Sequence, residues 1–249
     1  MSYFWFHLVF TLPPLLLVVL IQGRPIAGNE GKRASFALLL ITLLALLYTT
    51  PWDNYLIWQG VWHYGIDCVV GTIGFVPIEE YLFFILQPLL TGLWLYWLLG
   101  RLPEPVGQEH YRIVRSFGTV FLVVLSLTGA LMLRWNHTTY LGLILVWAGP
   151  ILALQWVVGA RQIWVNSWAW LVGTIVPTLY LWVADRVAIA QGIWKISEEY
   201  TTGLALFSLP IEEATFFLLT NLMVVQGLLL ILLLELGQLP GVKLDESSS

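Results

Sequence analysis

The 249-residue sequence has little charge, since only 10% of its residues are Asp, Glu, Lys or Arg. Hydrophobic residues make up 59% of the chain, and the mean hydropathy is +0.82. A soluble domain carries about 25% charged residues, so this composition excludes a soluble globular protein and predicts a polytopic membrane protein. No basic patch is present, which argues against nucleic-acid binding. Cys68 is the only cysteine, which excludes an intrachain disulfide.

Several motifs that hold metals, cofactors or activated substrates are also missing. The chain has no Cys/His cluster for zinc and no G-x-G-x-x-G turn for a dinucleotide. It has no Asp-rich cluster of the kind that holds a magnesium diphosphate, which disfavours prenyl transfer. The last apolar segment contains no lysine, so a retinal Schiff base is excluded there. We therefore expect neither a metal nor a cofactor.

Long apolar segments dominate what remains. A membrane-spanning helix needs about 20 apolar residues, and seven segments qualify. The expected fold is an all-α bundle of about seven transmembrane helices with no extramembrane domain. The first segment lacks a basic leader and a cleavage site, which favours a retained span over a signal peptide. The predicted spans are 3–22, 34–50, 75–99, 117–135, 139–158, 166–184 and 204–234.

The distribution of Lys and Arg predicts how the bundle is oriented. Loops after spans 1, 3 and 5 share a side with the C-terminus, and they carry eight of the eleven basic residues. The positive-inside rule then predicts a multi-pass protein of the cell (cytoplasmic) membrane with its N-terminus outside and its C-terminus in the cytoplasm. The eight are Arg24, Lys32, Arg33, Arg101, Arg112, Arg115, Arg161 and Lys243, and the other three are Arg134, Arg186 and Lys195.

The sequence contains an internal repeat. At an offset of 132 residues, Asp53 matches Asp185 and Trp62 matches Trp194; at 133, Pro77 matches Pro210. Tyr3 likewise matches Tyr140 farther upstream. Corresponding spans lie four apart, so the two halves run in the same direction. The predicted organisation is an N-terminal three-span repeat at 1–100, a connector with span 4 at 101–138, a C-terminal three-span repeat at 139–240 and a disordered tail at 241–249.

The strongest element of the repeat is an eight-residue motif. Residues 77–84 read P-I-E-E-Y-L-F-F, and residues 210–217 read P-I-E-E-A-T-F-F. Proline is favoured in the first turn of a helix, so Pro77 and Pro210 are predicted to open spans 3 and 7. One interpretation is purely structural, because carboxylates in a first turn face the positive end of the helix dipole.

The competing interpretation of the motif is functional. An acidic side chain near the middle of a membrane helix costs roughly 2.5–3.5 kcal/mol, and ionisable residues inside a membrane are functional-site hypotheses. Span 7 is expected to begin near Leu204, which places Glu212 about eight residues, or ~12 Å, inside it. A carboxyl group shielded from water favours its protonated form. We therefore predict that catalytic acid and base are supplied by Glu79, Glu80, Glu212 and Glu213.

Other repeated side chains are expected to support these glutamates. Each glutamate precedes a phenylalanine by four residues, so a ring lies one helical turn away and presents a π-face to a cation. These cation-stabilising candidates are Phe83, Phe84, Phe216 and Phe217, although they could equally serve only to pack the bundle. The aspartates Asp53 and Asp185 are expected to follow spans 2 and 6, as ordinary interfacial residues or as support for a glutamate's proton. Trp62 and Trp194 are either supporting or interfacial residues.

At these residues the sequence resembles the integral-membrane lycopene beta-cyclase family, which exists as two small subunits in some bacteria and as a fused form in archaea and fungi. The resemblance rests on the duplicated P-x-E-E-x-x-F-F in three-span halves, each with an upstream aspartate and Gly-x-Trp, and it covers nearly the whole chain. It implies redox-neutral cyclisation of the ψ-ends of lycopene to β-rings, giving γ-carotene and β-carotene. It also implies a carotenoid substrate dissolved in the lipid bilayer, and it allows association with other carotenoid biosynthesis enzymes.

Two other functions remain open at this point. A carotenoid hydratase would form the same cation and capture it with water. A proton-coupled transporter would use the paired carboxylates as an ion pathway. If the two motifs form one shared site, Glu79→Gln and Glu212→Gln should each abolish activity.

Overall fold

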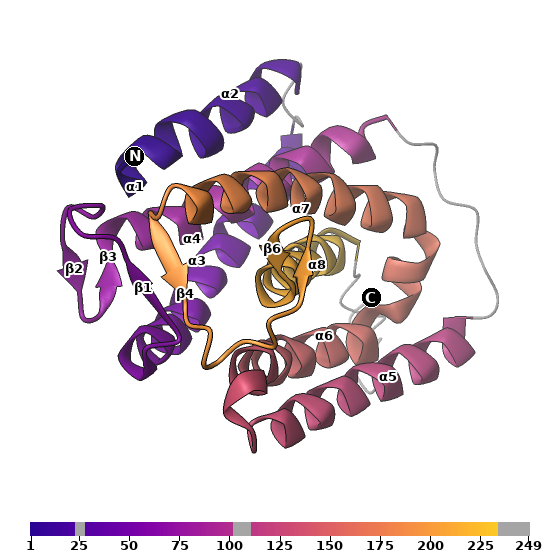
Figure 1. Ribbon diagram of the computed structural model, residues 1–249. Coiled ribbons are helices and arrows are strands. Elements are labelled where there is room, and N and C mark those ends of the chain that lie inside the picture. The colour runs from indigo at the N-terminus through magenta and orange to yellow at the C-terminus, as the bar shows by residue number, and fades with distance from the viewer. Residues whose placement is uncertain (23–27, 102–110, 234–249) are drawn as a thin grey trace, which may run out of the picture.

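Seven helical stretches among the described residues are long and apolar enough to cross a membrane, which confirms the predicted all-α bundle (Figure 1). The computed structural model describes residues 1–22, 28–101 and 111–233, and the predicted tail at 241–249 lies outside them. The helical elements are α1 (Tyr3–Phe6), the π-helix η1 (His7–Thr11), α2 (Leu12–Ile21), α3 (Gly28–Gln59), α4 (Ile78–Leu99), α5 (Tyr111–Met132), the short 3₁₀ helix η2 (Asn136–Thr138), α6 (Thr139–Val165), α7 (Ser167–Ala190) and α8 (Ile211–Leu233). The strands are β1 (Trp62–Tyr64), β2 (Thr72–Ile73), β3 (Val76–Pro77), β4 (Trp194–Ile196), β5 (Ala205–Leu206) and β6 (Leu209–Pro210).

The two helices that carry the motifs lie at the centre of the bundle. In α4 and α8, 61% of the spanning window is buried inside the protein, against 6% in α5. Figure 1 shows α8 surrounded by the other helices, with α5 at the edge. Leucines on the outer faces are exposed, which costs nothing in lipid because acyl chains are as apolar as the side chains.

Several predicted span boundaries were wrong, and three of these errors bear on the site. Span 7 does not begin near Leu204, because residues 205–210 form the β5–β6 hairpin and α8 begins at Ile211. Spans 2 and 6 run on to Gln59 and Ala190. Both aspartates that were expected to follow these spans therefore lie inside helices.

The two halves predicted from the internal repeat meet through a pair of strands. Strands β1 and β4 pair antiparallel, with His63 opposite Lys195. The hydrogen bonds around this pair are symmetric: Gly65 N–H donates to the Ile193 carbonyl (2.9 Å), and Ser197 N–H to the Val61 carbonyl (2.8 Å). An equivalent strand from each half thus pairs about a local two-fold axis, which supports the prediction of like-directed repeats.

Helix α5, the predicted connector, packs along α6 at glycines. A methyl group added at Gly129 would lie 2.6 Å from Leu145 Cβ, and one at Gly142 would lie 2.8 Å from the Gly129 carbonyl oxygen. Small residues allow helix backbones to approach closely in membranes. This helix therefore attaches to the outside of the second half and leaves the centre to α4 and α8.

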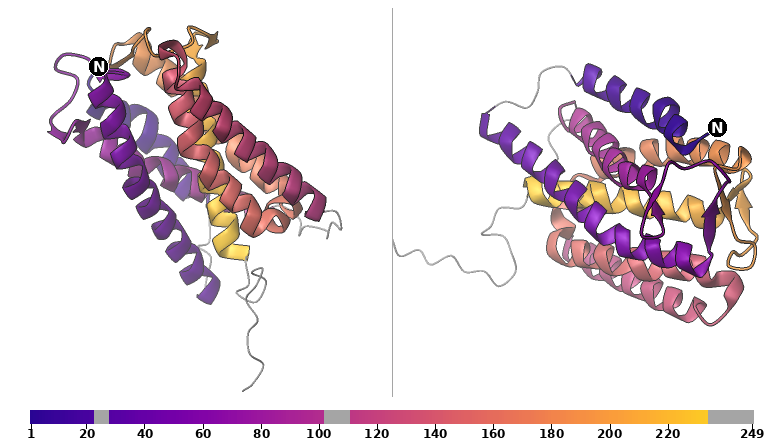
Figure 2. Two further views of the ribbon diagram at one scale, coloured as in Figure 1. Left: turned by 90° about the horizontal axis from the view of Figure 1, so that it is seen from below. Right: turned by 90° about the vertical axis from the view of Figure 1, so that its left-hand side faces the viewer.

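The loops before α4, α6 and α8 gather at one end of the bundle, beside the N-terminus (Figure 2, left). Tyr3 N–H donates to the Cys68 carbonyl (2.8 Å), and Tyr140 N–H donates to the Tyr200 carbonyl (3.0 Å). Each first helix of a half is thereby tied to a loop that leads into a motif. Both motifs consequently start from the same end of the bundle.

Candidate functional site

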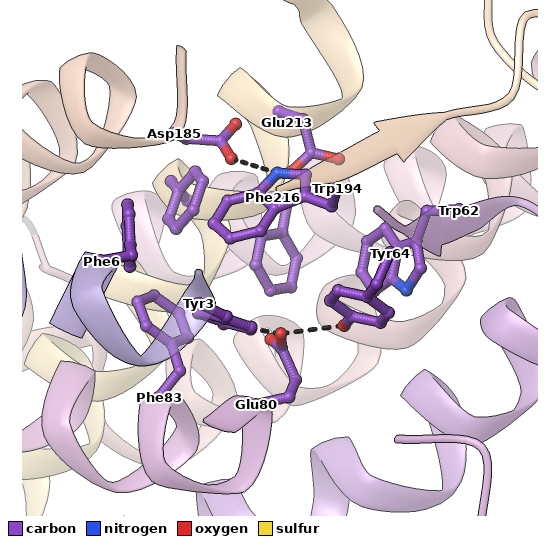
Figure 3. Close-up of a pocket in the computed structure, with 11 residues that line it drawn as sticks. Tyr3, Phe6, Trp62, Tyr64, Glu80, Phe83, Asp185, Trp194, Glu213 and Phe216 are labelled. Carbon is purple, nitrogen blue, oxygen red and sulfur yellow. Dashed lines mark hydrogen bonds between the residues drawn. The ribbon is translucent and has the colours of Figure 1, made fainter. Parts of the chain in front are cut away.

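A small cavity lies between the two motifs, under the strand pair (Figure 3). Its free volume is about 30 Å³, which is enough for one or two water molecules and far less than a substituted six-membered ring. Aromatic side chains would therefore have to move to admit such a group. The cavity is lined by Tyr3, Phe6, Trp62, Tyr64, Glu80, Phe83, Asp185, Trp194, Glu213, Phe216 and Phe217.

One glutamate from each motif, the second of each pair, faces this cavity. Glu80 accepts hydrogen bonds at Oε2 from the hydroxyls of Tyr3 (2.6 Å) and Tyr64 (3.0 Å). Glu213 accepts one at Oε1 from the Tyr140 hydroxyl (2.7 Å). The two carboxyl groups are close enough for their charges to interact. The structure thus brings acidic groups from both halves to one apolar, aromatic space.

Tyr64 belongs to the loop strand β1, outside the spans, and its ionisation is suppressed. Burial and then the nearby Glu80 carboxylate raise the pKa of Tyr64 well above its ordinary value. The phenol therefore keeps its proton at neutral pH and acts as a hydrogen-bond donor to Glu80.

The first glutamate of each pair is used differently. Glu79 accepts a hydrogen bond at Oε1 from Val70 N–H (2.8 Å). Glu212 accepts at Oε1 from both the backbone N–H (2.7 Å) and the hydroxyl (2.8 Å) of Thr202. Each of these carboxylates is buried and binds the loop that leads into its own helix. Neither is among the residues lining the small cavity.

Both motif prolines precede a helix, as predicted. Pro77 caps α4 and Pro210 ends the strand before α8. The glutamates of both motifs consequently lie in first turns, so the expectation that Glu212 sits about eight residues inside its helix was wrong. A first-turn position agrees with the structural interpretation of the motif, yet a capping carboxylate is normally solvated, and Glu212 is 0% exposed.

The predicted phenylalanines divide between two cavities. Phe83, Phe216 and Phe217 line the small cavity, and Phe83 meets Phe217 edge-to-face with ring centroids 6.1 Å apart. Phe84 lies instead on a neighbouring, larger cavity, which also includes Phe83 and Phe216.

The tryptophans line the cavity and connect the halves. Trp194 of the second half packs against Tyr3 of the first, with centroids 5.0 Å apart, and Trp62 packs against Tyr140 in the symmetric contact, at 5.4 Å. Each of these two tyrosines therefore binds a glutamate of its own half and contacts a tryptophan of the other. Positioning of one carboxyl group depends on both halves.

The aspartates are buried within helices rather than interfacial, each 1% exposed. Asp185 lines the cavity and accepts a hydrogen bond at Oδ1 from Trp194 Nε1 (2.8 Å). Neither carboxylate oxygen of Asp53 has a hydrogen-bond partner in the part of the chain that the structure describes. Asp53 lies near enough to Glu80 and Glu213 for their charges to interact. The two matched aspartates thus flank the same carboxyl pair.

Several site residues carried little or no signal in the sequence. Tyr3 and Tyr140 are aligned by the internal repeat, and this match could have identified them. The internal repeat does not align Tyr64 or His7 with an identical residue, so the sequence did not single them out. His7 lies in the π-helix η1, where its Nε2 donates to the Glu79 carbonyl (2.8 Å) and its Nδ1 then accepts from the Thr11 hydroxyl (2.9 Å). Local π-helical turns occur frequently at functional sites.

No metal site accompanies these groups in the described ranges, where no three His, Cys, Asp or Glu side chains are placed to hold an ion. The side chains at the cavity can give or accept protons and present ring faces to a positive charge. An arrangement of this kind suits acid–base chemistry on an apolar molecule.

Comparison with known proteins identifies relatives that match most of the chain. A family profile described as lycopene cyclase matches residues 137–231. A lycopene beta-cyclase of Halobacterium salinarum is 45% identical over 229 residues, which cover 92% of this chain and 95% of the relative. Bifunctional lycopene cyclase/phytoene synthases of Phaeosphaeria nodorum and Neurospora crassa are 36% and 37% identical, over 39% of their own lengths. No solved structure matches. A seven-span bundle with duplicated glutamate motifs, alignable almost end to end with such a relative, belongs to the lycopene cyclase family.

Proposed function

We propose that the chain is a lycopene beta-cyclase that converts the ψ-end groups of lycopene to β-rings within the membrane. The observation that carries this proposal is the pair of carboxyl groups, Glu80 and Glu213, at one aromatic cavity. The relative that aligns over 95% of its own length bears the same activity in its name. Lycopene is a hydrocarbon that dissolves in the bilayer, which agrees with a site enclosed by spanning helices.

The reaction needs one acid and one base. A carboxyl group donates a proton to C2 of the terminal C1=C2 bond, which leaves a cation at C1. The C5=C6 electron pair then forms the C1–C6 bond and moves the cation to C5. A carboxylate removes the proton from C6, and the C5=C6 bond is restored within the ring. One proton is gained and one is lost, so the product is an isomer and no oxidant or reductant is consumed.

Glu80 and Glu213 are the proposed acid and base, with either order of roles. Phe83, Phe216 and Phe217 present ring faces that stabilise the cation and exclude water that would otherwise capture it. Asp53 and Asp185 are proposed to assist the proton transfers beside them. Glu79 and Glu212 are proposed to position the active-site loops. We therefore expect Glu80→Gln and Glu213→Gln to abolish activity, in place of the Glu79→Gln and Glu212→Gln variants that the sequence suggested.

Tyr140→Phe is expected to slow cyclisation more than Tyr3→Phe does. Glu213 has one described tyrosine donor, whereas Glu80 keeps Tyr64 when Tyr3 is changed. A hydrogen bond to a charged group is worth about 1.5–3 kcal/mol, so the rate should fall roughly ten- to a hundredfold in Tyr140→Phe. Rates are measured as product carotenoid per amount of purified protein. A larger loss in Tyr3→Phe would contradict the assignment.

Glu79→Gln should retain most of the activity, whereas Glu79→Ala should reduce stability. Glutamine keeps an oxygen that accepts from Val70 N–H, but alanine leaves that donor unpaired, at a cost of about 1–3 kcal/mol. The matched pair Glu212→Gln and Glu212→Ala should behave alike at Thr202. Thermal unfolding in detergent and pigment formation are the two measurements. A loss in Glu79→Gln as deep as in Glu80→Gln would show that the first glutamate is catalytic.

Expression in a lycopene-accumulating bacterium tests the function directly. Chromatography of the pigments should show lycopene replaced by γ-carotene and β-carotene. Unchanged lycopene alongside well-expressed protein would refute the proposal, and a tertiary alcohol in place of a ring would indicate a hydratase.

Location and orientation follow the distribution of charge. The seven apolar spans indicate a multi-pass membrane protein, and we propose the cell membrane, with the N-terminus and the motif loops outside and the C-terminus in the cytoplasm. Phosphatase and fluorescent-protein fusions at the C-terminus distinguish the two orientations, because the phosphatase is active only outside. Association with other enzymes of carotenoid biosynthesis is proposed on the substrate's insolubility in water, and co-purification tests it.

A further inference from the structure

A second, larger cavity adjoins the glutamate cavity and shares two of its walls. It lies between α3, α4, α6 and α8 and has a volume of about 220 Å³. Phe83 and Phe216 line both spaces, and they therefore separate the second cavity from Glu80 and Glu213. Most of its other lining is aliphatic or aromatic, including Ile41, Leu44, Ala45 and Ile151. This cavity continues the acidic site toward the interior of the bundle.

Near-parallel aromatic rings are stacked beside this cavity; Tyr48, Trp147 and Phe216 line it, and Trp52 stacks on the last two. Tyr48 stacks on Trp147, with centroids 5.6 Å apart and planes 16° apart. Trp147 stacks on Trp52 at 4.6 Å and 19°, and Trp52 stacks on Phe216 at 5.7 Å and 7°. Stacked rings of this kind form a flat apolar surface. We call these four residues, Tyr48, Trp147, Trp52 and Phe216, the aromatic wall.

The aromatic wall joins the outside of the bundle to the reaction cavity. At its outer end, Tyr48 is 41% exposed, and Leu44 one turn earlier is 50% exposed. Within the spanning region these faces contact lipid acyl chains. At its inner end, Phe216 borders the cavity with the two glutamates. The Tyr48 hydroxyl donates to the Trp147 carbonyl (2.9 Å), which fixes the outer ring across two helices.

We infer that this second cavity holds the part of the conjugated chain next to the reacting end group, while that end group reacts beside Glu80 and Glu213. This inference rests on the proposed function. A polyene is flat, rigid and apolar, so it fits a flat ring surface in a cavity with few polar groups. It enters from the lipid alongside α3, end first. Because a single reaction cavity serves one end at a time, the monocyclic product leaves and re-enters with its other end before the second ring forms.

Filling the cavity tests the inference. Ala45 lines it, so Ala45→Trp should obstruct the polyene, whereas Leu47→Trp places the same ring on the lipid face of the same helix, where Leu47 is 70% exposed. With lycopene, Ala45→Trp should lower turnover by about tenfold or more, the factor that about 1.4 kcal/mol of lost binding produces. Leu47→Trp should retain the wild-type rate. A truncated analogue that has the same ψ-end, with a tail too short to pass Phe83 and Phe216, should be cyclised by Ala45→Trp at close to the wild-type rate.

The outcomes separate this inference from the proposed function. If wild-type protein cyclises neither substrate, the proposed function has failed. If wild-type protein is active and Ala45→Trp converts lycopene at an unchanged rate, the cavity holds only lipid acyl chains and the inference is overturned. Equal loss on lycopene and on the truncated analogue would overturn it too, since the substitution would then have damaged the reaction cavity. As a binding readout, less lycopene should co-purify with Ala45→Trp/Glu213→Gln than with Glu213→Gln alone.

Discussion

Glu80→Gln and Glu213→Gln are each expected to reduce lycopene cyclisation by about 10²–10⁴-fold, the usual contribution of a general acid or base. Glutamine is close in shape to glutamate, and it still accepts a hydrogen bond from Tyr3 or Tyr140, so the fold should be retained. It can neither donate a carboxyl proton to an alkene nor remove one from a cation. Because both groups face one cavity, each variant should lose both the first and the second ring closure.

The measurement is chromatography of pigments formed by purified protein in lipid vesicles, with thermal unfolding as the control for folding. The number of sites is read from the same experiment. Two independent sites would leave each single variant able to make monocyclic γ-carotene at a normal rate, and that outcome would refute a shared cavity. The matched variants Glu79→Gln and Glu212→Gln show whether loss of any motif carboxylate has the same effect.

Asp53→Leu is expected to make the protein more stable and much less active. Asp53 is 1% exposed, and both of its oxygens lack a hydrogen-bond partner in the described residues. Buried polar groups that serve only the structure are normally hydrogen-bonded. Burying a polar group without a hydrogen-bond partner costs about 1–3 kcal/mol, so leucine at this position should raise the stability by a similar amount. A carboxyl group kept at such a cost beside Glu80 and Glu213 is best explained by a part in proton transfer.

The expected loss of activity is about a hundredfold, the lower range for an acid–base group. Unfolding temperature and carotenoid yield are measured on the same preparation. Asp185→Leu is the matched variant: it should gain less stability, because it deprives Trp194 Nε1 of its acceptor. A stable Asp53→Leu protein with full activity would place Asp53 outside the reaction.

Hydropathy and the repeat were sufficient to predict the seven spans and the residues of the motif, but they misplaced the start of α8. Residues 204–210 are mostly apolar, and hydropathy does not distinguish an apolar hairpin from the first turns of a helix. The hairpin turns through Phe207 and Ser208, which have positive φ angles of 50° and 67°. Neither residue is a glycine, so no glycine marks this turn in the sequence. For this reason the prediction that Glu212 lies about eight residues inside its helix was wrong.

Which glutamate of each pair faces the cavity also could not be predicted from the sequence. Successive residues on a helix point about 100° apart, so one member of an adjacent pair faces the cavity and the other faces a loop. Both glutamates of each pair are conserved between the two copies of the motif, so the internal repeat does not distinguish them. Similarly, the second span was predicted to end at residue 50, before Asp53, yet α3 continues through Pro51 to Gln59. Packing between helices that are distant in the sequence decides these outcomes, and a single sequence does not encode it locally.

The antiparallel pairing of β1 with β4 bears on how the chain could have arisen. Opposing His63 and Lys195 occupy the same place in the two halves, so two identical shorter polypeptides could form this contact with each other, as the matching surfaces of a two-fold symmetric dimer do. Gene duplication and fusion would then have enclosed a former subunit boundary within one polypeptide. Once fused, the two sides were free to diverge: His7 beside Glu79 has no counterpart opposite, because Ile144 occupies the equivalent position.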